Sequence, residues 1–224
     1  MNTKERLTYL YHNASYSVIS NDLFVVFSDP HFGDMGPADD SAENRLIFET
    51  AWNSYKLKKY KILSAADWLE LWQFKKREVI CNWTPDYAVS GNHDKELGNT
   101  ESMILICQGQ RFFIVHGNQG DFFNDRGWKI GRFFTRYVWK PLEMIGVKSW
   151  LSTSKNIKRH DLVRNALCEW ANENKVTLIC GHTHTQEHEG YYWNVGSGVK
   201  EGIECIEGPP LKLVRWTERG RIVV

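Results

Sequence analysis

Polar residues of the kinds that bind metal ions recur at five places along this chain. They stand in the motifs Ser28-Asp29-Pro30-His31, Ala66-Asp67, Gly91-Asn92-His93-Asp94, His116-Gly117 and Gly181-His182-Thr183-His184, which hold five of the eight histidines. Asp, Asn and His offer hard oxygen and imidazole nitrogen donors, a set without thiolate that suits Mn²⁺, Fe, Zn²⁺ or Mg²⁺. One such histidine alone is often structural, but five motifs that recur at the same kind of position predict a metal site.

Each motif lies at or just after the end of an apolar segment that the sequence predicts to be a buried strand. Strands are expected at 23–28, 62–66, 87–90, 112–116, 177–180 and 211–216, and helices at 40–55, with a capping box from Asp40 and Glu43, and at 162–171. This alternation predicts a layered α/β fold with a central sheet. Because the carboxyl ends of strands in such a sheet form ligand sites, the five motifs should meet in one crevice.

Length and composition predict a single globular domain over residues 1–224. The chain is 42% hydrophobic and 25% charged, without repeats or low-complexity tracts. Residues 1–21 carry no signal peptide, and no apolar run reaches membrane-spanning length. The five cysteines form an odd set without a CxxC pair, which indicates buried, reduced thiols and a cytoplasmic protein.

The order of the motifs resembles that of the calcineurin-like metallophosphoesterase superfamily. The pattern Asp-x-His, Asp, Gly-Asn-His-Asp, His, Gly-His-x-His extends over residues 25–198, nearly the whole chain. The resemblance implies a β-sandwich flanked by helices and a centre of two metal ions. It assigns to the first ion Asp29, His31 and His184. It assigns to the second ion Asn92, His116 and His182, with Asp67 as the bridge between the two.

The same resemblance implies hydrolysis of a phosphoester or pyrophosphate bond. Two divalent ions about 3.5–4 Å apart lower the pKa of a bridging water, so that hydroxide attacks, and neutralise developing charge. Mn²⁺ is the expected metal, before Fe, Zn²⁺ or Mg²⁺. His93 should stabilise or protonate the leaving oxygen, and Asp94 should orient His93, as carboxylates commonly orient imidazoles.

Two residues depart from the pattern of the superfamily. Ala66 stands where glycine usually precedes the bridging Asp, a conservative change if the backbone there does not need a positive φ. Asn118 stands where many relatives carry His or Asp. Neither change removes a ligand, so an enzyme is expected, and a metal-free binding scaffold is the alternative that metal analysis would detect.

The residues from Asp67 to Trp72 bear on the substrate. They resemble the Asp-x-x-Glu-x-Trp stretch of the UDP-diacylglucosamine pyrophosphohydrolases, which implies a lipid-linked nucleotide as substrate. Those relatives carry a helical insertion before the last motif. Here 65 residues separate His116 from His182, so an insertion at about 121–160 could form a lid or serve structure alone.

The insertion is basic and aromatic. Residues 126–159 contain nine basic residues and one acid, although the whole chain has a net charge of +1. An amphipathic helix is expected, with an apolar face of Ile130, Phe133, Phe134, Tyr137 and Val138, and the apolar pattern continues through Ile145 and Trp150. A basic stripe runs alongside it at Lys129, Arg132, Arg136 and Lys140.

This combination suits an anionic membrane surface, and hence a location peripheral to the membrane, or an acylated, phosphate-bearing substrate. A nucleic-acid backbone is an alternative partner, and a protein or small-nucleotide phosphatase is a third reading.

Overall fold

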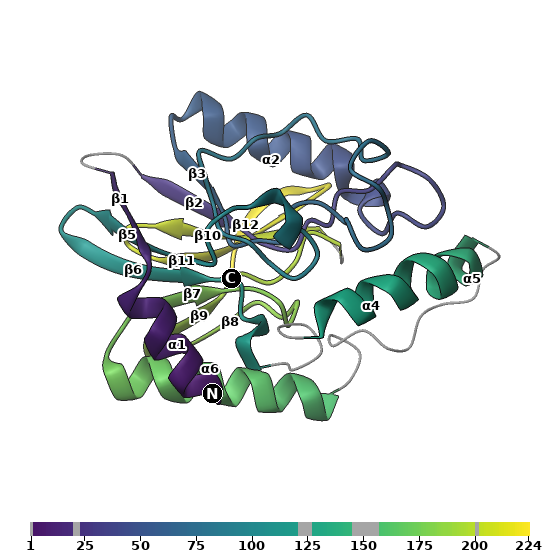
Figure 1. The fold of residues 1–224 in the computed structure, drawn as a ribbon. Helices are drawn as coiled ribbons and strands as arrows, with labels where there is room; N and C mark the ends of the chain where they lie inside the picture. Colours follow the sequence, from purple (N-terminus) through teal and green to yellow (C-terminus); the bar gives the residue numbers. More distant parts are fainter. Residues whose placement is uncertain (1, 20–22, 121–126, 145–156, 200–201) are drawn as a thin grey trace.

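Two six-stranded sheets lie face to face in the computed structural model, which describes residues 2–19, 23–120, 127–144, 157–199 and 202–224 (Figure 1). The first sheet has the order β1 (Ser15–Ile19), β5 (Ser102–Cys107), β6 (Gln110–Val115), β7 (Leu178–Cys180), β9 (Tyr192–Asn194) and β8 (Glu187–Glu189). The second has the order β12 (Gly220–Val223), β11 (Lys212–Thr217), β10 (Ile203–Gly208), β2 (Phe24–Phe27), β3 (Lys61–Ser64) and β4 (Tyr87–Ala88).

Helices cover the outer faces of both sheets. The helices α1 (Thr3–His12) and α6 (Ile157–Asn174) pack on the first sheet, and α2 (Arg45–Leu57) packs on the second. Short 3₁₀ turns lie at η1 (Ala42–Asn44), η2 (Lys95–Leu97) and η3 (Asn118–Gly120). The result is a four-layer arrangement of helix, sheet, sheet and helix.

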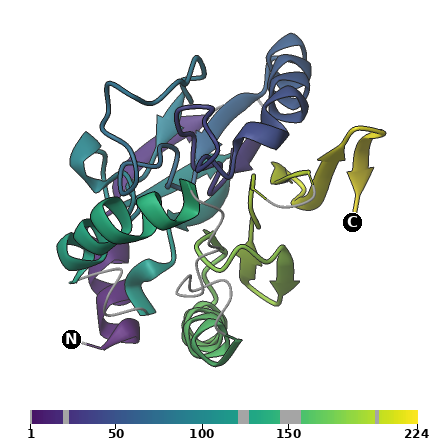
Figure 2. The same cartoon turned by 90° about the vertical axis from the view of Figure 1, so that its right-hand side faces the viewer.

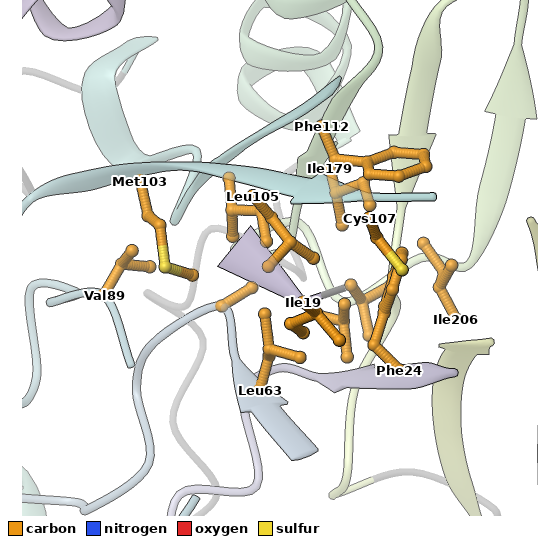
Figure 3. Packing of buried hydrophobic residues seen from close by; sticks show 14 of the residues in the cluster. Ile19, Phe24, Leu63, Val89, Met103, Leu105, Cys107, Phe112, Ile179 and Ile206 are labelled. Atoms are coloured by element: carbon orange, nitrogen blue, oxygen red, sulfur yellow. The ribbon is translucent and has the colours of Figure 1, made fainter. Parts of the chain in front are cut away.

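The strand β2 shows how the sequence specifies these layers. Its four residues are all buried, with Phe24 and Val26 in the core between the sheets and Val25 and Phe27 in the core beneath α2. A strand with both faces covered needs an unbroken apolar run instead of an alternating one. Figure 3 shows the core between the sheets, where Phe24, Leu63 and Ile206 face Leu105 and Phe112.

Parallel pairing brings the strand ends to one edge. The strands β2, β3 and β4 pair in parallel, and so do β6 and β7 in the other sheet. The sandwich implied by the family resemblance is confirmed, whereas the single central sheet expected from the pattern of strands and helices is wrong, because the strands form two mixed sheets. The capping box expected from Asp40 and Glu43 is wrong, because η1 precedes α2 and neither Ser41 nor Asn44 caps through its side chain.

The insertion is helical where it is described. The helix α4 (Trp128–Phe134), the π-helical turn η4 (Thr135–Trp139) and α5 (Lys140–Met144) follow one another without a break, and we call them together the insertion helix. Figure 2 views the molecule from the side on which this helix lies. The predicted apolar residues Ile145 and Trp150 lie outside the described residues.

The structure also bears on the expectations about membrane-spanning segments and cysteines. None of the described helices combines the length and apolar character needed to cross a bilayer. All five cysteines are free thiols, and all except the half-buried Cys81 are buried. The thiols are thus packed as small apolar groups.

Candidate metal centre

The site lies where strands of both sheets end. Asp29 follows β2 and Asp67 follows β3, and the backbone N–H of Asp29 donates to the Ala66 carbonyl at 3.1 Å. On the other sheet, His116 follows β6, and its carbonyl accepts from Gly181 N–H, after β7, at 2.8 Å. These bonds extend the strand pairing into the turns, so the backbone itself places the polar side chains together.

Left-handed backbone conformations turn the chain at these strand ends. The dihedral φ is +53° at Asp29, +48° at Asp67 and +70° at His182. It is also +86° at Ala66, so the condition under which alanine would be a neutral replacement for glycine is not met. Strained residues of this kind are often found at functional sites, where surrounding structure holds them in place.

The three residues expected to bind the first ion form one cluster. Asp29 Oδ1 lies 3.1 Å from His184 Nε2 and 3.6 Å from His31 Nε2. Ligand atoms of the three side chains all lie within 4.8 Å of one another. Two imidazole nitrogens and one carboxylate oxygen thus converge on one point.

The residues expected to bind the second ion lie beside this cluster. His116 Nε2 lies 3.1 Å from Asn92 Oδ1, 3.2 Å from His182 Nδ1 and 3.0 Å from Asp67 Oδ2. The same Asp67 oxygen is 4.0 Å from His31 Nε2 of the first cluster. One carboxylate oxygen therefore stands between the two groups, which is the position of a bridging ligand.

The second oxygen of each aspartate is held by hydrogen bonds. Asp29 Oδ2 accepts from the Ser28 hydroxyl at 2.5 Å and from His182 N–H at 3.0 Å, and Asp67 Oδ1 accepts from His93 N–H at 2.9 Å. Two glycines make room for them: a Cβ on Gly91 would lie 1.9 Å from Asp67 Oδ1, and one on Gly181 would lie 2.3 Å from Asp29 Oδ2. One oxygen of each is thus fixed and the other faces the histidines.

The donor set fits a pair of divalent cations. Among the described residues, His31 Nε2 is buried without a hydrogen-bond partner, although it faces two carboxylates. Burial alone would raise the pKa of Asp29, but the charges of His116 and His184 hold it well below its usual range. A divalent cation requires ionised carboxylates and deprotonated imidazole nitrogens, so a bound cation would replace the protons that these histidines share with the carboxylates.

Glu70 also lies in the site, although the sequence analysis did not assign it. Its Oε2 lies 2.7 Å from His31 Nδ1, and its Oε1 lies 2.7 Å from His93 Nδ1. A carboxylate on Nδ1 fixes the imidazole and leaves Nε2 to act. The available signal was its position in the Asp67 to Trp72 motif, three residues after the expected bridge.

Asp94 takes a different place from the one expected. Its two oxygens accept from the backbone N–H groups of Gly91 and Trp68, both at 2.8 Å. The carboxylate expected beside His93 is instead that of Glu70, which can accept from His93 Nδ1. Burial and the charge of Asp67 raise the pKa of Asp94 to about 6. Asp94 therefore ties together the two loops that carry Asp67 and Asn92.

Several solved structures resemble this chain at low sequence identity. A predicted phosphoesterase from Streptococcus pneumoniae TIGR4 is 18% identical, with 91% of this chain and 98% of that one covered and a TM-score of 0.44. Two structures of Vps29 from Entamoeba histolytica each cover 90% of this chain and 97% of theirs. The single mutant is 14% identical with a TM-score of 0.49, and the wild type complexed with Zn²⁺ is 15% identical with a TM-score of 0.47.

A search of curated proteins gave no match. The model of the calcineurin-like phosphoesterase family matches residues 23–186, which include every residue of the two clusters. This chain therefore belongs to the calcineurin-like phosphoesterase family.

Proposed function

We propose that this protein is a dinuclear metal-dependent hydrolase of phosphoester or pyrophosphate bonds. The observation that carries the proposal is the position of Asp67 Oδ2, 3.0 Å from His116 Nε2 and 4.0 Å from His31 Nε2, between two groups of ligand atoms. Two bound divalent cations, Mn²⁺ in the first place, would supply an activated water and charge neutralisation for the phosphoryl group.

The chain's own residues have separate tasks in this proposal. Asp29, His31 and His184 would hold one ion, and Asn92, His116 and His182 would hold the other, with Asp67 available to both. His93 carries the proton to the leaving oxygen through Nε2, because its Nδ1 is engaged by Glu70. Buried Asp94 keeps the loops in place.

Metal analysis of matched variants tests this assignment. The wild type, stripped with EDTA and reloaded with Mn²⁺, should hold close to two ions per chain and hydrolyse an aryl phosphodiester. Asp67→Ala should lose both metal and turnover, whereas Asp161→Ala, which removes an exposed carboxylate on α6, should lose neither. Hydrolysis that EDTA leaves unchanged, in a protein without divalent metal, contradicts the proposal.

The substrate that we propose is a lipid-linked pyrophosphate such as UDP-diacylglucosamine. The insertion helix supports it, because its apolar side chains Phe133, Phe134 and Tyr137 are 58%, 52% and 61% exposed. Gly131 of the same helix packs on Trp72, which stacks on His93. An acyl chain could thus lie on the helix while the phosphate occupies the metal centre.

Most of the basic stripe binds the protein itself, although an anionic partner was expected for it. Arg132 pairs with Glu96, Lys140 lies 3.7 Å from Glu78, and Arg136 donates to backbone carbonyls. Three of its four cations therefore bind the body of the protein, and an anionic polymer would have to displace these contacts. This favours an apolar ligand over a nucleic-acid backbone.

A substrate panel distinguishes these readings. With Mn²⁺ present, turnover of UDP-diacylglucosamine should exceed turnover of single-stranded DNA, cyclic nucleotides and phosphoserine peptides. Preference for DNA would assign a nuclease, and preference for phosphoserine would assign a protein phosphatase. Either result would contradict the lipid-linked substrate but would be compatible with metal-dependent hydrolysis.

A further inference from the structure

Trp72 lies between the proposed proton donor and the insertion helix. Its indole stacks on the His93 imidazole with ring centroids 4.2 Å apart and an interplanar angle of 12°. Its Nε1–H donates to the carbonyl of Asn92, the residue before His93, at 2.6 Å. Trp72 is only 6% exposed, so the protein surrounds it on its other sides. The His93 ring is therefore held at its face by Trp72 and at its edge by Glu70.

The insertion helix contacts Trp72 through a residue without a side chain. A Cβ on Gly131 would lie 2.9 Å from both Cη2 and Cζ3 of the indole. That distance is closer than van der Waals contact, so any larger residue at 131 must displace the indole or lift the helix. The helix backbone at Gly131 thus packs directly against the six-membered ring of Trp72.

Arg136 fixes the turn that carries both supports of His93. Its guanidinium donates to the carbonyls of Leu71, Trp72 and Phe74, the last at 3.0 Å. Within the turn, the backbone N–H of Trp72 donates to Glu70 Oε1 at 3.2 Å. The docking of the helix therefore determines where the turn, and with it the indole and the Glu70 carboxylate, can lie.

We propose that Trp72 is a positioning residue for His93, and that the insertion helix holds Trp72 in place through Gly131 and Arg136. The proposal rests on the proposed role of His93 as the group that protonates the leaving oxygen. A proton donor acts only within hydrogen-bond reach of that oxygen, so a displaced ring costs rate even when metals and substrate are bound. The docked helix thereby completes the catalytic geometry.

Dependence on the leaving group separates this role from a structural one. Phenoxide is a poorer leaving group than 4-nitrophenoxide and depends more on protonation. With Mn²⁺ and a matched pair of aryl phosphodiesters, His93→Ala should lower kcat far more on the phenyl ester than on the 4-nitrophenyl ester. Gly131→Ala should show the same selectivity, with a loss of about tenfold on the phenyl ester and unchanged KM and metal content.

Two comparisons complete the design. Lys129→Ala, an exposed change in the same helix turn, should match the wild type on both esters. Trp72→Phe removes the Cη2 and Cζ3 atoms that the new Cβ would meet and also removes the bond to Asn92, so it should cause its own selective loss. In the double variant Trp72→Phe with Gly131→Ala, the loss should not exceed that of Trp72→Phe alone.

The outcomes are distinct. Equal losses on both esters, multiplicative losses in the double variant, or a Gly131→Ala enzyme with wild-type rates would each overturn the positioning role, while a selective loss in His93→Ala keeps the proposed function. If His93→Ala lowered kcat equally on both esters, His93 would not be the proton donor, and the positioning role of Trp72 would also be wrong. Alanine favours a helix more than glycine does, so lowered helix stability does not account for a selective loss.

Discussion

The carboxylate of Glu70 serves two histidines at once. Each of its oxygens lies 2.7 Å from an Nδ1 atom, one of the proposed ligand His31 and one of the proposed proton donor His93. Burial alone would raise the pKa of Glu70, but the charge of His93 and the bonds from both histidines hold it well below its usual range. Glu70 should therefore be ionised at neutral pH and accept from both rings.

Replacement of Glu70 by Gln should impair both functions. One oxygen becomes an NH₂ group, which cannot accept from an Nδ1–H, so one of the two imidazoles loses its tautomer or its orientation. We expect kcat to fall by about 10²-fold and metal affinity by about 10–100-fold. Kinetics and metal titration would measure these changes. The control is Glu101→Gln, which alters a half-buried carboxylate paired with Arg6 and Lys95. A Glu70→Gln variant with the kcat and metal affinity of the wild type would contradict the proposed role of Glu70.

Asp94→Ala should act through stability. It leaves the N–H groups of Gly91 and Trp68 without their acceptor, and each unsatisfied buried donor costs about 1–3 kcal/mol. We expect the free energy of unfolding of the metal-free protein to fall by about 2–4 kcal/mol in a denaturant titration. Asp161→Ala should change it by less than about 0.5 kcal/mol. An unchanged midpoint for Asp94→Ala would show that water replaces the carboxylate.

At the level of elements, the strands that precede proposed ligands could be predicted better than the other strands. The strands β2, β3, β4, β6 and β7 were expected as apolar runs that a polar motif follows, and β11 was expected as an apolar run without a motif. The strand β5 is just as apolar, but it runs antiparallel to β6 and carries no ligand at its end, so a search guided by motifs does not find it. The exposed edge strand β1 and the helix α1 were also not expected, because their patterns are largely polar.

In the site, the residue types could be read from local sequence, whereas their contacts depend on the fold. That the seven proposed ligand residues would lie together could be predicted, because residue types that bind metals recur after apolar runs. The partner of His93 could not, since Glu70 and Asp94 are both near it and only the fold places one of them on Nδ1. For the insertion helix, periodicity predicts two faces but not which one meets the protein. The partners of the basic face, Glu96 and Glu78, lie far away in sequence.

The exposed apolar face gives a prediction for the insertion helix. Replacing Phe133, Phe134 and Tyr137 by Ser should change the free energy of unfolding little, because all three are more than half exposed. Binding of a lipid substrate should weaken strongly, since full burial of each side chain is worth about 1.5–3 kcal/mol. Hydrolysis of a small aryl phosphodiester should persist.

The measurement is KM for both substrates beside thermal unfolding. Leu46→Ser with Leu57→Ser on α2, where both leucines are exposed, is the matched control and should affect neither substrate. Equal loss on both substrates with a lowered Tm would instead assign the apolar face to the structure.

For the whole molecule, the proposed metal centre lies where the two sheets meet. Asp29, Asp67 and Asn92 follow strands of the second sheet, and His116, His182 and His184 follow strands of the first. Bound cations would link the two halves of the sandwich at one edge. Without cations, the two sheets are joined at this edge by charged pairs such as His116 with Asp67. The strength of such a pair depends on its burial and on whether the histidine is protonated.

The pH dependence of this link has a definite sign. Burial would lower the pKa of His116, but the charges of Asp67 and Asp29 raise it to about 9 from an ordinary value of 6.5. A raised folded-state pKa contributes stability that is complete below about pH 6.5 and is lost as the pH rises through 9. The raised pKa of Asp94, about 6, changes stability at lower pH, outside this window.

The metal-free protein should therefore lose thermal stability between pH 6.5 and pH 9. Cation binding requires neutral imidazoles, so its stabilisation should grow over the same window, reaching about 2.7 kcal/mol for each site at a hundredfold excess over Kd. Tm measured with EDTA and with Mn²⁺ should diverge as the pH rises. His116→Gln should reduce the alkaline decrease in the metal-free protein. A part should remain, because burial would lower the pKa of His31 but Asp29 and Glu70 hold it well above its ordinary value. His188→Gln, an exposed change outside the site, should preserve the full decrease. A metal-free Tm that is flat from pH 6.5 to pH 9 would show that His116 is not held protonated by its two aspartates.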